Sequence, residues 1–113
     1  MTVSYEGIGA WSATCTTENA VEGQVVKIGG NGAAAKCSSG DAFCGVAGPV
    51  RGGVCAVQLG GLAEVCYSGE TAPTAGVQVL TADGNGGVCV AGEGASYWVL
   101  SVDTAAGTCV IKL

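Results

Sequence analysis

Glycine-rich turns recur along this sequence at intervals of roughly ten residues, and they restrict the elements between them to short segments. Glycine accounts for 21 of the 113 residues, and its freedom to adopt positive φ suits it to tight turns. Between the turns apolar and polar residues alternate, whereas no window of helical length carries a 3.6-residue apolar period. The sequence therefore predicts an all-β chain, with turns at residues 29–32, 39–41, 51–53, 60–61, 83–87, 92–94 and 104–107.

Nine segments between these turns have the alternation and composition of short strands. Turn signals at this spacing are typical of a small glycine-rich barrel or sandwich of short antiparallel strands. A short helix is predicted only at residues 71–76, where a threonine and a proline suit a first helical turn. The predicted strands are residues 24–28, 34–37, 42–46, 54–59, 62–67, 77–82, 88–90, 97–102 and 109–112.

Residues 1–20 differ from the rest because they are polar and rich in Thr and Ser, with Tyr5 and Trp11 standing alone among small residues. We expect this segment to form an extended N-terminal arm and residues 21–113 to form one β-rich domain. Large aromatic side chains that a segment cannot bury locally often dock on a partner. Tyr5 and Trp11 are therefore expected either to contact a partner or to pack back on the domain.

Charge and residue content exclude several classes of function. The formal net charge is −5 and only four residues are Lys or Arg, so there is no basic stripe for nucleic acid. The sequence has no histidine, which removes the Ser-His-Asp and Cys-His arrangements of catalysis. No apolar run approaches the roughly 18 residues that span a membrane, and no signal peptide is recognisable. We expect a protein without enzymatic activity, cofactor or membrane contact, made and retained in a cytoplasm.

Seven cysteines lie at positions 15, 37, 44, 55, 66, 89 and 109, and none of their spacings is that of a structural zinc site. An odd number without a signal peptide favours reduced, buried thiols at strand positions. If Gly60 and Gly61 form a two-residue hairpin turn, Cys55 faces Cys66, and a disulfide between them is geometrically possible. A cysteine-based metal or redox protein is a further alternative.

Two glycine-rich motifs are better explained by turns than by ligand binding. Residues 30–35 match a dinucleotide-binding loop superficially, but no crossover helix is expected after them. Residues 83–87 resemble the start of a calcium loop, yet the position of its bidentate carboxylate is occupied by Gly94. The sequence therefore predicts no nucleotide and no metal site at either motif.

Arg51 stands out in a chain with few charges, because it lies between Val50 and two glycines at a predicted turn. It is predicted to be either a plain turn arginine or a bidentate contact between subunits. The acidic residues show no spacing that would pair two of them across a cleft for glycoside hydrolysis. We expect solvated side chains in or beside turns for Glu64, Asp83, Glu93 and Asp103.

Several short glycine-rich motifs follow one another in a particular order along residues 21–113. Residues 40–46 read G-D-A-F-C-G-V, residues 51–53 lead into A-V-Q-L-G-G, and further motifs lie at residues 23–32, 72–76, 82–84 and 102–112. In this order and spacing the motifs resemble the head decoration, or capsid cement, proteins of tailed bacteriophages. The sequence departs from that family in its cysteines, which occupy strand positions where Val, Thr or Ala is usual.

The resemblance implies a β-protein that binds the outer surface of an expanded phage head as a homotrimer and cements neighbouring major capsid proteins. Such a protein is made in the host cytoplasm and becomes part of the virion. The resemblance further implies that Tyr5 and Trp11 anchor an arm on the shell and that Arg51 serves the trimer interface.

An alternative interpretation is a small β-barrel module that binds a carbohydrate or a host receptor. Its platform would consist of Tyr67, Tyr97 and Trp98. Because side chains alternate along a strand, Tyr97 and Trp98 are expected on opposite faces, which weakens a shared platform.

Overall fold

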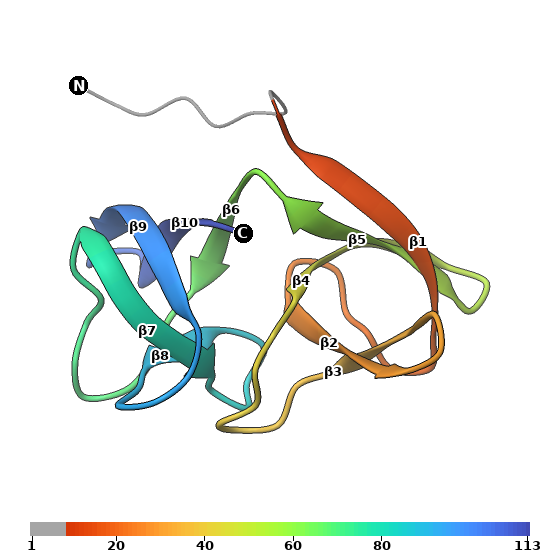
Figure 1. Ribbon diagram of the computed structural model, residues 1–113, viewed down its shortest axis with the longest axis horizontal. Helices are drawn as coiled ribbons and strands as arrows, with labels where there is room; N and C mark the ends of the chain where they lie inside the picture. The colour runs from red at the N-terminus through yellow and green to blue at the C-terminus, as the bar shows by residue number, and fades with distance from the viewer. Residues whose placement is uncertain (1–8) are drawn as a thin grey trace.

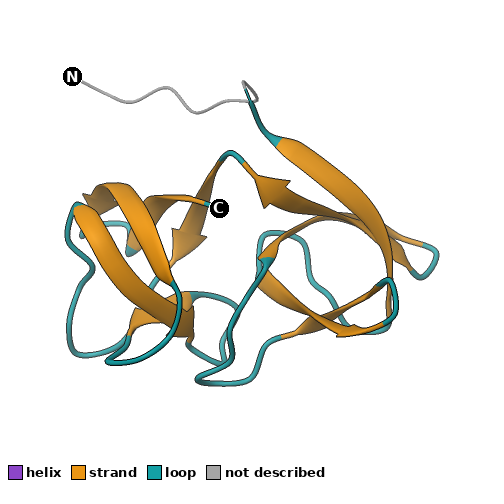
Figure 2. Ribbon diagram, in the orientation of Figure 1, coloured by secondary structure: helices purple, strands orange, loops and turns teal. Residues whose placement is uncertain are grey.

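The computed structural model describes residues 9–113, and within them the chain is all-β, without a helix (Figures 1 and 2). The all-β prediction is thus confirmed. The strands form a closed barrel and a separate five-stranded sheet, which lie side by side along the long axis. The strands are β1 Trp11–Thr17, β2 Val25–Gly30, β3 Ala33–Lys36, β4 Gly45–Arg51, β5 Val54–Gly60, β6 Leu62–Cys66, β7 Gly76–Ala82, β8 Val88–Val90, β9 Ser96–Asp103 and β10 Thr108–Lys112.

The barrel has the strand order β1-β3-β2-β4-β5, and β1 closes it by pairing with both β3 and β5. Its β1–β3 pairing is parallel, which departs from the expected antiparallel strands. β1 also comprises residues 11–17, which we expected to belong to the extended N-terminal arm. The arm interpretation is wrong for residues 11–17, because their main chain pairs along β5 from residue 11 to residue 16.

The second sheet has the strand order β6-β10-β9-β7-β8 and its ladders are antiparallel, while a single parallel bridge joins Tyr67 to Val88 (Figure 1). The chain enters it directly from the barrel, because β5 ends at Gly60 and β6 begins at Leu62. Gln58 holds this corner by donating from Nε2 to the carbonyl oxygens of Gly60, at 3.1 Å, and Leu62, at 2.9 Å. Gly61 between them has φ of 86°, a conformation that strongly favours glycine.

Two hydrophobic clusters hold the molecule together. One fills the barrel, and the other lies between the barrel and the second sheet. Strands β2 and β4 serve both clusters, because consecutive residues point to opposite faces of a strand. Val26 and Ala47 point into the barrel, whereas Val25 and Val46 pack against the second sheet. The two halves therefore share a core and form one domain.

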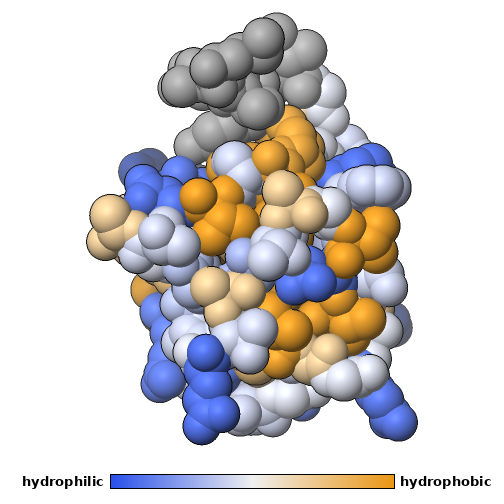
Figure 3. All heavy atoms as spheres, turned by 90° about the vertical axis from the view of Figure 1, so that its left-hand side faces the viewer, coloured by the Kyte–Doolittle hydropathy of each residue, from blue (hydrophilic) through white to orange (hydrophobic). Residues whose placement is uncertain are grey.

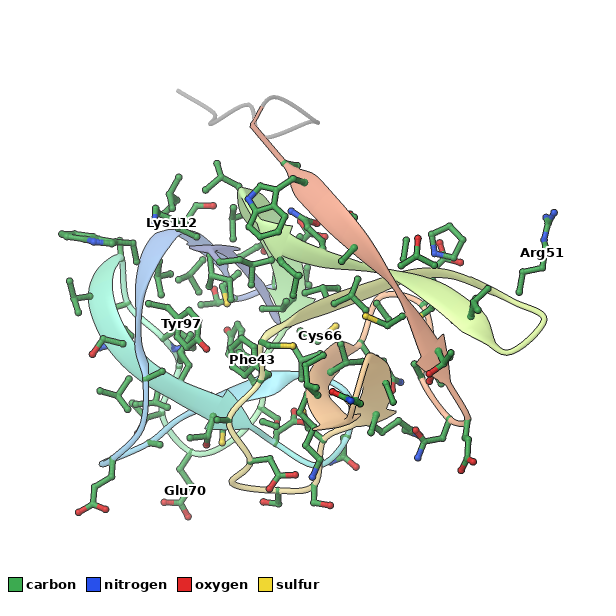
Figure 4. All side chains as sticks on the ribbon, turned by 45° about the vertical axis from the view of Figure 1, so that its right-hand side comes forward. Phe43, Arg51, Cys66, Glu70, Tyr97 and Lys112 are labelled. Atoms are coloured by element: carbon green, nitrogen blue, oxygen red, sulfur yellow. The ribbon has the colours of Figure 1, made fainter. Side chains whose placement is uncertain are left out.

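The segment between β3 and β4 ties the two halves together through hydrogen bonds. Gly40 N donates to Ala82 O at 2.8 Å, and Ala82 N donates to Asp41 O at 2.9 Å. Tyr97 stacks on Phe43 with ring centroids 4.7 Å apart, and its hydroxyl donates to Phe43 O at 2.9 Å (Figure 4). The strand predicted at residues 42–46 is therefore only partly formed. β4 begins at residue 45, and residues 42–44 belong to this connecting segment.

Two further predictions need correction. Residues 71–75 form a loop rather than a helical turn, and Gly76 at its end has φ of 112°, outside the helical region. β1 adds a tenth strand to the nine that the sequence predicted. The described residues contain no helix with the length and apolar character needed to cross a membrane.

Candidate interaction surfaces

The hairpin between β4 and β5 carries Arg51 at its tip. Gly52 and Gly53 form the turn with φ of 60° and 80°, and Arg51 is the Cα partner of Val54. The Arg51 side chain points away from the body of the molecule (Figure 4) and makes no ion pair or hydrogen bond with any of residues 9–113. Val50 and Val54 beside it are 41% and 40% exposed. The tip thus offers a guanidinium group framed by two exposed valines.

Trp11 opens β1 and lies over the backbone of the barrel. It is the Cα partner of Gly60, and a Cβ added at Gly60 would run into the Trp11 indole ring. One face of the ring thus covers the glycine, while 59% of the side chain remains exposed. The structure therefore places Trp11 on the domain itself, with an exposed surface left for a partner. Tyr5, the other predicted anchor, lies outside the described residues.

Val77 and Trp98 form an exposed apolar pair on the outer face of the second sheet. They are Cα partners on β7 and β9, and their side chains are 54% and 58% exposed. Apolar side chains are visible among polar ones on this side of the molecule (Figure 3). Sequence reasoning missed Val77, because only the pairing of β7 with β9 brings it beside Trp98.

The aromatic platform predicted for a carbohydrate-binding module is not formed. Tyr67 and Tyr97 are both half-buried and pack against the core between the two halves, whereas Trp98 faces outward. The expected separation of Tyr97 and Trp98 onto opposite faces of the strand is thus confirmed. Three aromatic side chains that do not share a surface cannot stack together on one sugar ring.

A groove of about 470 Å³ lies where β1 runs beside β3. Its threonine and asparagine side chains already have partners within the fold. Asn19 Oδ1 accepts a hydrogen bond from Lys36 N at 3.1 Å, and Thr17 Oγ1 accepts one from Ala20 N at 2.9 Å. Most of its other lining residues are glycines and alanines, namely Gly29, Gly30, Ala33, Ala34, Ala35 and Gly53. The groove therefore offers few functional groups to a ligand.

The acidic side chains at two predicted turns accept hydrogen bonds from the backbone of their own turns, and Asp83 Oδ2 also accepts one from Ser68 Oγ at 2.7 Å. Asp83 Oδ1 accepts hydrogen bonds from Asn85 N at 2.7 Å and Gly87 N at 3.0 Å. Asp103 Oδ1 accepts bonds from the backbone nitrogens of residues 105 and 106, both at 3.1 Å. Both carboxylates therefore stabilise their own turns, as the turn interpretation of residues 83–87 predicts.

An ion pair joins Lys27 on β2 to Asp41 in the connection between β3 and β4. Lys27 Nζ and Asp41 Oδ2 are 2.6 Å apart. The hydrogen bond from Lys27, followed by one from the Ser38 backbone, lowers the pKa of Asp41, and the same contact raises the pKa of Lys27. Both side chains are partly exposed to solvent, so the pair organises the loop rather than a buried reaction centre.

All seven cysteines are free thiols. The predicted facing of Cys55 and Cys66 is wrong, because Cys55 lies on β5 in the barrel and Cys66 on β6 in the second sheet. Cys55 is instead the Cα partner of Cys15 on β1. Burial raises the pKa of Cys37 and of Cys109 to about 11, which keeps these thiols protonated at neutral pH.

Among residues 9–113 no three His, Cys, Asp or Glu side chains converge on a position where they could hold a metal ion. The β2–β3 turn leads into a strand rather than a helix, so residues 30–35 do not form a dinucleotide-binding loop. What the described surface offers is exposed Trp, Val and Arg side chains on a rigid β-framework. No family model and no curated protein matches the sequence.

Proposed function

We propose that the chain is a non-enzymatic capsid decoration protein. In this proposal it binds the outer surface of an expanded phage head as a homotrimer and cements neighbouring major capsid proteins. The host cytoplasm is the place of synthesis, and the virion is the place of action. The motifs along residues 21–113 suggest this role, and the exposed side chains described above supply the contacts that it needs.

The observation that carries the proposal is the separation of two exposed surfaces on one compact framework. The hairpin tip with Arg51 and the exposed indole of Trp11 lie at opposite ends of β5, since Arg51 is the Cα partner of Val54 and Trp11 that of Gly60. Trp and Arg are the residues most enriched at the energetic centres of protein interfaces. A module that bridges two neighbouring proteins needs two such surfaces, held apart by the fold so that each can contact its own partner.

Each surface has a proposed partner. Tyr5 and Trp11 contact the shell. Trp11 does so from strand β1 of the barrel rather than from a mobile arm. Arg51 contacts a second copy of the chain, where its guanidinium group would bind a carboxylate in a bidentate manner. Cyclic symmetry then repeats each contact, and many copies on one shell bind with high avidity even if each contact is weak.

The proposal is tested by sedimenting the purified chain with expanded capsids that lack decoration, while its mass in solution is measured by light scattering. We expect saturable binding with a fixed copy number per capsid protein. Trp11→Ala should reduce binding at least tenfold and Arg51→Ala should lower the trimer fraction. Trp98→Ala serves as the matched aromatic control, and a loss of binding in this variant alone would move the shell contact to the second sheet.

Absence of binding to any decoration-free shell, with a stable monomer in solution, would overturn the proposal. A glycan array would then test the alternative of a surface-binding module.

A further inference from the structure

Two of the seven cysteines lie opposite each other where the barrel closes. Cys15 on β1 and Cys55 on β5 are Cα partners in an antiparallel ladder. No other two cysteines in residues 9–113 are partners in a strand pairing, since Cys66 is paired with Thr108 and Cys89 with Thr81. This placement is independent of whether the chain binds a capsid.

The ladder geometry suits a covalent bond between the two side chains. Thr17 N donates to Gly53 O at 2.9 Å, and hydrogen-bonded positions recur every second residue, so Cys15 and Cys55 also occupy a hydrogen-bonded position. Such partners have Cα atoms about 5.5 Å apart, within the range of about 4.4 to 6.8 Å found in disulfides. Both side chains point to the same face and belong to the core inside the barrel.

We propose that Cys15 and Cys55 are a disulfide-forming pair that locks the barrel when the protein meets a small disulfide oxidant such as oxidised glutathione. One cysteine thiolate attacks the oxidant, breaks its S–S bond and releases one glutathione thiolate. The second thiolate then attacks the mixed disulfide, forms the Cys15–Cys55 bond and releases the second glutathione. Two protein thiols lose two electrons and two protons, and one oxidised glutathione becomes two reduced ones.

Burial controls when the bond forms. Cys15 is 8% exposed and Cys55 2%, and burial together with the neighbouring Cys15 raises the pKa of the Cys55 thiol. Because the thiolate is the reacting species, oxidation of the folded protein is slow. The bond therefore forms while the chain folds, or when β1 opens transiently from β5, and it persists once the barrel has closed over it.

The bond would act on the strand pairing that closes the barrel. The main chain of β1 is held in the barrel by its ladders with β3 and β5, and the β3 pairing covers two residue pairs. A covalent link to β5 prevents β1 from leaving the barrel and restricts the unfolded chain between residues 15 and 55. We expect the oxidised protein to melt about 10 °C above the reduced protein.

The experiment refolds reduced wild-type protein in a mixture of oxidised and reduced glutathione, blocks the remaining thiols with iodoacetamide and digests with trypsin plus a Glu-specific protease without reduction. These cuts place the four C-terminal cysteines on separate peptides, 52–64, 65–70, 71–93 and 94–112. We expect peptide 7–18, which carries Cys15, to be linked to peptide 52–64, which carries Cys55. Refolded protein with both thiols alkylated, or Cys15 linked to any other peptide, would overturn the proposal.

Melting curves of oxidised and reduced protein give a second readout. Cys15→Ala should abolish the difference between the two midpoints, whereas Cys109→Ala, which removes an equally buried thiol without a cysteine partner, should retain it. If Cys15→Ala fails to fold, the peptide map of the wild-type chain still decides. An equal midpoint for oxidised and reduced wild-type protein would show that the pair does not lock the barrel.

Discussion

The barrel and the second sheet of this molecule reach a stable arrangement in different ways. The barrel core is built from small side chains and, among the described residues, contains no aromatic ring; it consists of Cys15, Ala20, Val26, Ala34, Ala47, Cys55 and Val57, with Leu59 packed against it. The core between the barrel and the second sheet includes Phe43, Leu80 and Ile111, with Tyr67, Tyr97 and Leu113 at its margin.

The difference follows from closure rather than from strand number, since each half has five strands and only the barrel is closed by strand ladders. The interior of a barrel narrows as the number of strands falls, so a barrel of five strands admits only small side chains. Closure of the barrel also leaves no strand with a free edge, because the main chain of every strand is paired on both sides. Within residues 9–113 the two ends of the second sheet are linked only by a single bridge between Tyr67 and Val88, and its inner face buries apolar side chains against Val25 and Val46 of β2 and β4. Both halves thus have extensive main-chain pairing, but the barrel combines it with a core of small side chains and the second sheet with a core that holds larger ones.

The largest expected effect comes from Ile111, which is fully buried in the core of the second sheet. Ile111→Ala removes three carbons and leaves a cavity, so we expect a loss of about 3 to 4 kcal/mol in the free energy of unfolding. Val57→Ala at the centre of the barrel should cost about 2 kcal/mol, because fewer atoms are removed. Urea denaturation measures both. A larger loss for Val57→Ala would reverse the proposed division between the two halves.

A loss of about 2 to 3 kcal/mol, smaller than that of Ile111→Ala, is expected for Gly45→Ala in the barrel. A Cβ at residue 45 would collide with the Gln58 carbonyl oxygen and contact Val57, so part of the backbone would have to shift. Gly92→Ala is the matched control, because a Cβ there meets no atom of the described residues within 4 Å. Equal denaturation midpoints for the two variants would contradict a tightly enclosed barrel.

The burial of Cys109 in the second sheet predicts a dependence on alkaline pH. Burial, followed by the nearby Cys66 and Glu64, raises the pKa of Cys109 from 9.0 to about 11. Between these values the unfolded chain releases the thiol proton while the folded chain retains it, so stability falls as the pH rises. Urea midpoints measured under reducing conditions from pH 8 to 11 should decline less steeply in Cys109→Ala. Parallel slopes would argue against this assignment.

The smallest effect is expected for the ion pair that joins Lys27 to Asp41. Lys27→Met should lower the denaturation midpoint slightly at low salt, because exposed ion pairs contribute little and are screened. The difference from wild type should vanish in 1 M NaCl, where the Debye length is about 3 Å. Lys36→Met, at an exposed lysine on the neighbouring strand, is the matched control and should leave the midpoint unchanged at both salt concentrations.

Local patterns predicted most strands but not how they are paired. The alternation around residues 54–59 and 62–67 located β5 and β6 to within one residue. The same pattern implied a hairpin at Gly60 and Gly61, whereas the chain turns there from the barrel into the second sheet. Counting residues back from that predicted hairpin therefore gave Cys66 as the partner of Cys55, whereas the partner in the structure is Cys15. β1 escaped prediction because its sequence is polar, and its ladder with β5 joins residues about forty positions apart.

The sequence by itself determined the fold class of this protein, which is all-β. Frequent glycines and period-two alternation permit only short strands joined by tight turns, and the absence of histidine excludes common catalytic arrangements. Only the tertiary structure decided that β1 closes the barrel, that Cys15 faces Cys55 and that Val77 lies beside Trp98. Alternation specifies which residues share a face within one strand, whereas the neighbour of that strand depends on packing across the whole chain.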